Sequence, residues 1–298
     1  MNRKFREIDA TIAGLNQSTD AHFKWLVKVL RFIASREGDL PEITCEDAHH
    51  YCDFGHWLNG KLLEERGDKN FLLDINKQHI SVHHACRTLV STIEHDKYAI
   101  EAFNAFEKAL LVFSEALSSY KMHLLQLRTS YDALTGLPLR RVLDESFPSM
   151  NKELSKEGLW LMLLDVDHFK KVNDDYGHLN GDIVLRALAT QLDDNIRLSE
   201  SVYRYGGEEF IILLQAPGEL EAITAAERLR RLMAATDITA GEYTIRVTFT
   251  SGLTRINYGE SLREVLERAD IALYKGKASG RNCTMVINSL LESHKINA

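Results

Sequence analysis

The first part of the chain repeats apolar residues at a spacing that places them on one continuous face of an α-helix. Over residues 5–33 the pattern recurs every three or four positions, which is the distance between neighbouring turns of a helix. Similar stripes cover residues 72–89 and 103–124, and a shorter helix is expected near residues 46–65. Long helices with short connections are typical of an antiparallel four-helix bundle. We therefore expect residues 1–128 to form an all-α four-helix bundle.

Two of these stripes carry a histidine where leucine would be expected. The face predicted for the first helix comprises Phe5, Ile8, Ile12, Leu15, Thr19, His22, Leu26, Val29 and Ile33. His79 lies on the second stripe, and His83 follows at i+4, so both rings leave the same side of that helix. Cys52 lies in the shorter helical stretch. Three imidazoles and one thiolate form a tetrahedral donor set suited to Zn²⁺, and bundle cores commonly hold such sites.

Structural roles compete with this interpretation. A single histidine on an apolar helix face is usually a core residue with one hydrogen bond, and an i, i+4 pair alone does not establish a metal site. Nine of the twelve histidines lie in residues 1–128. Six of them receive no ligand role: His49, His50, His56, His84, His95 and His123. Cys45 and Cys86 are expected to act as small hydrophobic residues.

The ligand candidates occur in an order that resembles the chemoreceptor zinc-binding (CZB) domain: His22, then Cys52-x-Phe54-Gly55-x-Trp57, then His79-x-x-x-His83. The resemblance covers about the first 128 residues. It implies one regulatory Zn²⁺ per subunit, bound by the three histidines and the cysteine, in a bundle that forms a homodimer. It also suggests that zinc inhibits the activity of the rest of the chain.

The pattern changes at residues 129–138, where glycine and proline interrupt the helical spacing. Leu159–Val166 is an apolar run, typical of a buried strand, and it contains one carboxylate near its end. Val202–Tyr205 and Phe210–Leu214 flank Gly206-Gly207 like the arms of a hairpin. Further elements are expected in alternation: helices over residues 139–154, 180–197, 219–235 and 261–278, and strand residues within 243–256. This order predicts an α/β (α+β) domain over residues 129–298, with a mostly antiparallel sheet covered by helices.

Carboxylates gather at the ends of the predicted strands. Asp165 and Asp167 lie at the end of the apolar strand, and Glu208 and Glu209 follow the two glycines of the hairpin. If these strands are neighbours, Asp165 and Glu208 can share divalent cations, because Mg²⁺ offsets the repulsion between carboxylates and also binds phosphate oxygens. A glycine hairpin with glutamates can equally be a solvated turn, so this pattern alone leaves both interpretations open.

Five motifs in register resemble the GGDEF domain of diguanylate cyclases over about residues 129–290. They read D-x-L-T-G-L-P at 132–138, D-x-D-x-F-K-x-x-N-D at 165–174, G-H-x-x-G-D at 177–182, R-Y-G-G-E-E-F at 204–210 and A-L-Y-x-x-K-x-x-G-R-N at 272–282. The resemblance implies a nucleotidyl-cyclase-like fold. It further implies that two such domains face each other and condense two GTP molecules into cyclic di-GMP and two pyrophosphates.

The same resemblance assigns roles to individual residues. It places two Mg²⁺ ions, replaceable by Mn²⁺, on Asp165, the Val166 carbonyl and Glu208. Either Glu208 or Glu209 takes the 3′-hydroxyl proton, and Lys170 offsets transition-state charge. The groups expected to bind GTP are Phe169, Lys170, Asn173, His178, Asp182, Gly206, Gly207, Lys277 and Arg281. For His178 a structural role is the alternative.

A candidate product-inhibition site precedes the glycine signature. Arg197-x-x-Glu200 stands where the family has Arg-x-x-Asp, and Arg228 is its expected partner. Glutamate keeps the charge but adds a methylene, which displaces the carboxylate by more than about 1 Å. Retained and weakened inhibition by cyclic di-GMP both remain open.

Composition narrows the function classes further. The net charge is −7, and neither segment has a basic excess, so DNA or RNA binding is not expected. The sequence lacks an apolar run of about 18 residues and a signal peptide, so we expect a cytoplasmic protein without membrane association. A non-catalytic receptor for cyclic di-GMP or GTP and a zinc-binding structural protein are the alternatives. The intact motifs argue against both.

Overall fold

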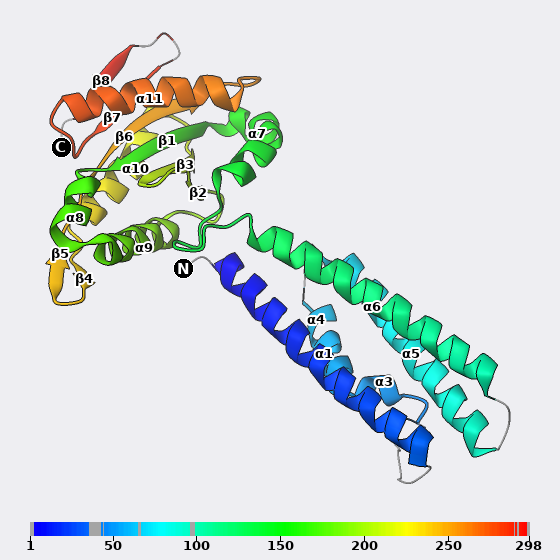
Figure 1. Ribbon diagram of the computed structural model, residues 1–298. Helices are drawn as coiled ribbons and strands as arrows, with labels where there is room; N and C mark the ends of the chain where they lie inside the picture. The colour runs from blue at the N-terminus through cyan, green and yellow to red at the C-terminus, as the bar shows by residue number, and fades with distance from the viewer. Residues whose placement is uncertain are drawn as a thin grey trace. The chain divides into compact units, whose positions relative to one another are not determined.

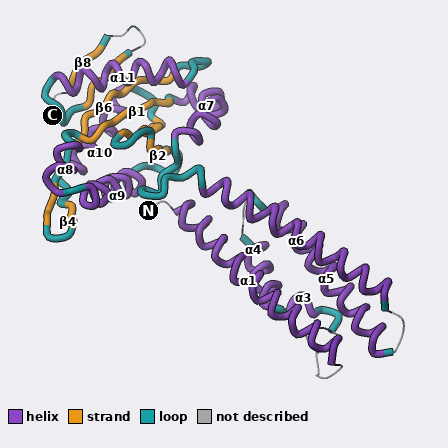
Figure 2. Tube along the Cα trace, viewed as in Figure 1, coloured by secondary structure: helices purple, strands orange, loops and turns teal. Residues whose placement is uncertain are grey.

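The computed structural model describes residues 3–35, 43, 45–64, 67–95, 99–288, 290 and 292–296. Contacts within the chain divide it into two units. One is Glu7–Arg128, and the other combines Met1–Arg6 with Thr129–Ala298. The first unit is helical, and the second combines helices with strands (Figures 1 and 2). None of the helices in the described part of the chain is long and apolar enough to cross a membrane.

The helical unit confirms the α-helical fold predicted for this segment. Its helices are α1 (Arg3–Ser35), α3 (Ala48–Tyr51), α4 (Asp53–Leu62), α5 (Lys69–Glu94) and α6 (Ile100–Arg128). Figure 1 shows α1, α4, α5 and α6 running side by side. One cluster of buried side chains joins all four, with Leu15, Phe54, Leu72 and Phe113 among its members. The predicted helix near residues 46–65 is divided in two at Cys52, whose backbone is extended.

The buried face of α1 differs in part from the predicted one. Its buried residues are Phe5, Ile8, Thr11, Leu15, Ser18, His22, Trp25, Val29 and Phe32. The predicted Ile12, Thr19, Leu26 and Ile33 are only half-buried. Each of these four residues directly follows the residue that is buried in its place. The predicted helical spacing is therefore correct, and the packing of the core buries the preceding residue instead. The large rings of Trp25 and Phe32 fill the core, and Thr11 is tolerated there because its hydroxyl donates to the Glu7 carbonyl at 2.7 Å.

The second unit is built on a six-stranded sheet with the order β2-β3-β1-β6-β7-β8. These strands are β1 (Leu159–Val166), β2 (Ser201–Arg204), β3 (Glu209–Gln215), β6 (Phe249–Ile256), β7 (Thr284–Ile287) and β8 (Ser293–Lys295). A separate hairpin pairs β4 (Ile238–Ala240) with β5 (Tyr243–Ile245). The only parallel pair among the described strands of the large sheet is β6 with β7. The predicted mostly antiparallel sheet is therefore confirmed.

Helices cover both faces of this sheet. They are α7 (Arg140–Leu154), α8 (Phe169–Tyr176), α9 (His178–Asn195), α10 (Glu219–Ala234) and α11 (Leu262–Ala278), with a short 3₁₀ turn η1 at Ser155–Glu157. In β1, Trp160 and Met162 belong to the cluster with α8, α9 and α10, whereas Leu161 and Leu163 belong to the cluster with α7 and α11. Because β1 is buried on both faces, it needs the apolar run from Leu159 to Leu164 that the sequence contains.

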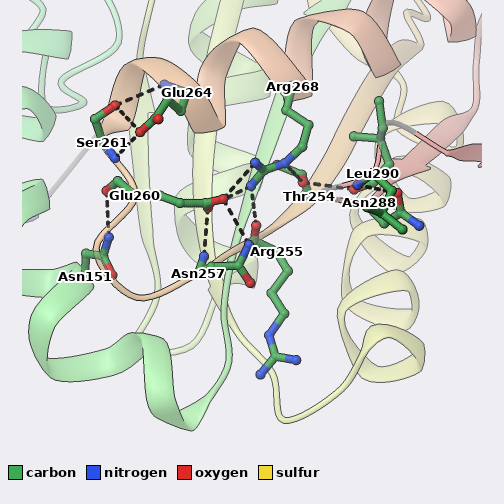
Figure 3. Close-up of polar contacts among 11 residues, drawn as sticks. Asn151, Thr254, Arg255, Asn257, Glu260, Ser261, Glu264, Arg268, Asn288 and Leu290 are labelled. Atoms are coloured by element: carbon green, nitrogen blue, oxygen red, sulfur yellow. Dashed lines mark hydrogen bonds and ion pairs between the residues drawn. The ribbon is translucent and has the colours of Figure 1, made fainter.

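A buried arginine holds the connection from β6 to α11 (Figure 3). Arg268 donates to Thr254 Oγ1 at 2.7 Å, to the Arg255 carbonyl at 2.7 Å, and to the two Glu260 carboxylate oxygens at 2.9 Å each. Ser261 and Glu264 form a capping box, which fixes the first turn of the helix. Because Lys277 lies in the last turn of the same helix, this network also helps to set the position of Lys277.

Candidate active site and metal centre

The glycine hairpin brings the predicted carboxylates together at the end of β1. Asp165 is the register partner of Glu209, and the Val166 N–H donates to the Glu208 carbonyl at 3.2 Å. Burial and the charge of Asp165 raise the pKa of both Glu208 and Glu209, against the opposing charge of Lys277. Carboxylates that repel one another in this way fit a divalent cation, since its charge removes the repulsion.

Lys277 lies beside the carboxylates at the end of β1. Its Nζ atom is 2.8 Å from Asp165 Oδ2. The predicted phosphate-binding cation is therefore adjacent to the predicted metal-binding carboxylate, so that a triphosphate bound here would reach both. Arg281 follows α11 in the loop before β7, with a left-handed φ of 62°.

Asp167 has a different role from Asp165, although the two are only two residues apart. Its carboxylate accepts hydrogen bonds from Thr248 Oγ1 at 2.6 Å, Thr250 Oγ1 at 2.6 Å and the Asn282 N–H at 2.9 Å. These bonds occupy both carboxylate oxygens. Asp167 therefore ties the end of β1 to β6 and to the loop that carries Arg281.

A half-buried ion pair between Arg204 and Asp132 supports the Gly206-Gly207 hairpin. Arg204 donates to Gly207 O at 2.7 Å and to Gly206 O at 3.3 Å, and its Nη1 is 2.6 Å from Asp132 Oδ2. Burial alone would raise the pKa of Asp132, but hydrogen bonds from Thr135 and Arg204 hold it below its usual value. The motif at residues 132–138 thus supports the motif at residues 204–210. Sequence reasoning missed this contact, because 72 residues separate Arg204 from Asp132.

The residues predicted to hold phosphates and guanine lie on α8 and α9. Phe169 and Lys170 are the first two residues of α8, where backbone N–H groups lack helical partners and attract anions. The Phe169 side chain belongs to the core. Asn173 on α8 packs directly against Gly181 on α9, because a Cβ atom at Gly181 would lie 2.0 Å from Asn173 Oδ1. Asp182 follows Gly181, so its backbone adjoins the Asn173 amide. His178 is exposed at the start of α9.

We expect Gly181→Ala to raise the KM for GTP about tenfold or more, the size of one lost buried hydrogen bond. The new methyl group would displace the Asn173 amide, which is predicted to read the guanine edge. Initial rates over a range of GTP concentrations would measure the effect. Leu179→Ala is the matched control, because that side chain is 82% exposed on the same helix. An unchanged KM in Gly181→Ala would exclude this role for Asn173.

The candidate product-inhibition residues meet at the turn between α9 and β2. Glu200 is buried, and its Oε2 accepts the Arg197 N–H at 2.8 Å. Arg228 reaches the same turn from α10 and donates to the Asn195 carbonyl at 2.7 Å. The Glu200 carboxylate thus closes the turn on which Arg197 lies.

The histidines predicted as zinc ligands converge inside the helical unit. His22 on α1 and His79 and His83 on α5 are buried, and each places a ring nitrogen within 4.8 Å of the other two. His79 Nε2 is 3.1 Å from His83 Nε2 and 3.2 Å from Cys52 Sγ. Ligand atoms around tetrahedral zinc are about 3.4 Å apart. His22 Nε2 is buried without a hydrogen-bond partner in the described part of the chain. This donor set fits one zinc ion.

The protonation of these groups also suits a metal. Burial lowers the pKa of His22 to about 4, of His79 to about 2 and of His83 to about 3, so all three are neutral ligands at pH 7. Burial raises the pKa of the Cys52 thiol, whereas amides including that of Gly55 oppose this. Cys52 Sγ accepts the Gly55 N–H at 3.2 Å as the N-cap of α4, a position that favours a thiolate.

Aromatic rings enclose the candidate zinc centre. The His22 ring centroid is 4.8 Å from that of Trp25 and 5.1 Å from that of Phe113, and Phe54 lies 4.9 Å from His79. Trp25 was absent from the predicted face of α1, although its i+3 spacing from His22 could have indicated it. A Cβ atom on Gly55 would lie 1.9 Å from the His49 carbonyl, so glycine permits the close chain approach next to Cys52.

Comparisons with known proteins agree with these two units. The model of the chemoreceptor zinc-binding domain matches residues 22–90, and that of the diguanylate cyclase GGDEF domain matches residues 129–283. The chain is 44% identical over 290 residues to diguanylate cyclase DgcZ of Escherichia coli K12, covering 97% of each chain. It is 36% identical over 185 residues to diguanylate cyclase DgcP of Pseudomonas aeruginosa, covering 61% of this chain and 27% of that protein.

A solved structure shows the same fold for the second unit. The coiled coil and GGDEF domain of DgcB from Caulobacter crescentus, in complex with c-di-GMP, superimposes with a TM-score of 0.55 at 29% identity. That match covers 61% of this chain and 99% of the other. The GGDEF match spans just over half of the 298 residues, and the likeness to DgcZ continues through the helical unit. The prediction that one chain contains both a zinc-binding domain and a cyclase domain is confirmed. The chain belongs to the GGDEF family of diguanylate cyclases, with a CZB domain ahead of its catalytic domain.

Proposed function

We propose that two copies of this chain condense two GTP molecules into cyclic di-GMP and two pyrophosphates, and that zinc in the helical unit inhibits the reaction. The observation that carries the catalytic part is the meeting of Asp165, Glu208 and Lys277 beside the glycine hairpin. The convergence of His22, Cys52, His79 and His83 supports the regulatory part. The cytoplasm, which supplies GTP, is the proposed compartment.

Different residues of the site would bind the metal ions and transfer the proton. Asp165, the Val166 carbonyl and Glu208 would hold two Mg²⁺ ions, or Mn²⁺, whose charge stabilises the attacking and leaving oxygens. Glu208 or Glu209 would accept the 3′-hydroxyl proton as a general base. That 3′-oxygen then attacks the α-phosphate of the other GTP, and pyrophosphate leaves.

The remaining residues hold the nucleotide. Lys277 and Arg281 would bind the β- and γ-phosphates as cations, together with the first N–H groups of α8. Asn173 and Asp182 would recognise the guanine edge, since an amide and a carboxylate complement its acceptor and donor groups. Gly206 and Gly207 leave room for the substrate beside the hairpin.

A dimer is needed because the product has two phosphodiester bonds between two nucleotides. Two domains that face each other would form both bonds in symmetric steps. We propose that the helical unit holds them together. Phe23, Val27 and Leu30 support this, because they form an apolar stripe at 61%, 59% and 50% exposure on the outer side of α1.

One assay tests the proposal against its alternatives. Purified chain is incubated with GTP and Mg²⁺, with added zinc or with a tight chelator, and cyclic di-GMP is quantified by liquid chromatography. We expect product in both conditions and a higher rate after zinc removal. Absence of product with retained GTP binding would favour a non-catalytic receptor. An unchanged rate after demonstrated zinc loss would exclude regulation by zinc.

We expect product inhibition to be weaker than in an Arg-x-x-Asp site and Glu200→Asp to strengthen it severalfold. The Glu200 side chain is buried, and its carboxylate accepts the hydrogen bond of the Arg197 N–H. This bond keeps the carboxylate from contacting bound cyclic di-GMP. Initial rates measured against added cyclic di-GMP would show the change. If micromolar product slows neither the wild type nor the variant, these residues form no inhibitory site.

A further inference from the structure

A buried ion pair on α10 lies close to the loop that carries Arg281. Arg230 and Glu227 are each only 6% exposed. Arg230 Nε donates to Glu227 Oε1 at 2.9 Å, and Nη2 donates to Oε2 at 2.8 Å. Burial alone would raise the pKa of Glu227, but hydrogen bonds from Arg230 and Thr284 hold it below its usual value. A buried ion pair adds little net stability, so stability alone does not account for it.

The third nitrogen of Arg230 contacts this loop. Nη1 donates to Asn282 Oδ1 at 2.7 Å and to the Asn282 carbonyl at 3.1 Å. From the opposite side, the Asn282 N–H donates to Asp167 Oδ2 at 2.9 Å. Asn282 is therefore fixed through its side chain, its carbonyl and its amide. The two elements that hold it are α10 and the end of β1.

The loop requires such support because its backbone is strained. Gly280, Arg281 and Asn282 have φ angles of 109°, 62° and 44°. A left-handed conformation costs a residue with a side chain about 1–2 kcal/mol, and it persists only where the surroundings impose it. Arg281 lies between Gly280 and the fixed Asn282, so the contacts of Asn282 determine where the Arg281 side chain begins.

We propose that Glu227, Arg230 and Asn282 are positioning residues that preset Arg281 for the terminal phosphates of GTP. Asp167 connects them to the strand end that carries Asp165, so that the phosphate-binding loop and the metal-binding carboxylate keep a fixed separation. Arg230 and Glu227 themselves do not touch the nucleotide. This proposal rests on the proposed function for the role of Arg281 and adds the residues that make Arg281 effective.

The test compares Arg230→Lys, Arg281→Ala and the double variant in binding of GTP and GDP, measured by calorimetry with Mg²⁺. Lysine keeps the charge beside Glu227 but cannot bond Glu227 and Asn282 together. We expect Arg230→Lys to weaken GTP binding about tenfold and GDP binding less, as expected for one misplaced charged contact. In the Arg281→Ala background, Arg230→Lys should have little further effect, because both changes remove the same contact.

Two further variants make the outcome decisive. Arg246→Lys is the control, because its side chain is 68% exposed and pairs with Asp237 rather than with a residue of this network. Asn282→Gly deletes the Oδ1 acceptor while keeping a residue that accepts positive φ, so it serves if Arg230→Lys fails to fold. Additive losses in the double variant, or undiminished GTP binding by Arg230→Lys or by Arg281→Ala, would overturn the proposal. Failure of the proposed function is distinct, because then the wild type would bind GTP without forming cyclic di-GMP.

Discussion

Glu208→Gln is expected to lower cyclic di-GMP synthesis by about 10³-fold or more, as the loss of a general base or of a metal-binding charge does. Glutamine keeps the size of the side chain but removes the negative charge that faces Asp165. Without that charge the site holds its cations less well, and one of the two candidate bases is lost. The rate at saturating GTP and Mg²⁺, followed by chromatography, gives the size of the effect.

The control for this variant is Glu242→Gln, an exposed carboxylate in the turn between β4 and β5. The Glu208 variant should retain its zinc content by atomic absorption and its mass by sedimentation, since Glu208 lies outside the helical unit. Undiminished product formation would refute the assignment of Glu208 as a metal ligand. Glu209→Gln, assayed in parallel, would distinguish the two candidate bases.

Acidification should inactivate the enzyme at a higher pH than an ordinary glutamate would require. Both Glu208 and Glu209 have a raised pKa, so they take up protons earlier as the pH falls. Only the deprotonated carboxylates can accept a proton or hold a cation. The acidic limb of the kcat/KM profile, measured at subsaturating Mg²⁺, should therefore lie above pH 4.5, the usual glutamate pKa, because kcat/KM reports the groups of the free enzyme. A limb below that value would contradict the burial of this pair.

His79→Ala is expected to lower the zinc affinity of the helical unit by about 10²–10³-fold. Four ligands provide roughly 10–16 kcal/mol in structural zinc sites, so that one ligand corresponds to about 2.5–4 kcal/mol. His79 Nε2 is the atom that adjoins both Cys52 Sγ and His83 Nε2, so its removal opens the centre of the donor set. Competition with a chromogenic chelator measures the affinity.

The cyclase rate of the His79 variant should then no longer respond to micromolar zinc. His56→Ala is the matched control, because His56 is exposed on α4 four residues after Cys52. Its zinc affinity and zinc response should equal those of the wild type. Wild-type affinity in His79→Ala would mean that zinc binds elsewhere.

The sequence predicted elements best where one physical signal dominated. The bounds of β1 were predicted without error, because every residue from Leu159 to Val166 except Asp165 is apolar and both faces of the strand are covered. By contrast, β8 reads Ser-His-Lys and was not predicted, because an edge strand pairs through its backbone and needs no apolar pattern. The short α8 was also missed, because eight residues with four charges carry little helical periodicity.

Some site residues could be recognised from the sequence, whereas others could be found only in the folded structure. The candidate zinc ligands were recognisable because their order along the chain carries a resemblance, and their assignment stays a prediction. The supporting contacts Arg204–Asp132 and Arg230–Asn282 could not be derived, since each joins residues more than 50 positions apart. Such contacts depend on the tertiary fold, and the spacing of residue types along the chain does not encode them. The distinct role of Asp167 was likewise visible only from its three hydrogen-bond donors.

The candidate zinc ligands come from three separate segments of the helical unit: α1, the N-terminus of α4, and α5. His22 and Cys52 are 30 positions apart, so an ion bound to both closes a long loop. Closing a loop of this span costs the unfolded chain about 3–4 kcal/mol of conformational entropy, so the folded helical unit binds such an ion much more tightly than the unfolded chain does. Zinc bound as proposed would therefore cross-link the folded helices without an oxidant, and a competing chelator could remove it. Changes in zinc concentration would then change how tightly the helices are cross-linked, and rigidity itself would be the regulated quantity.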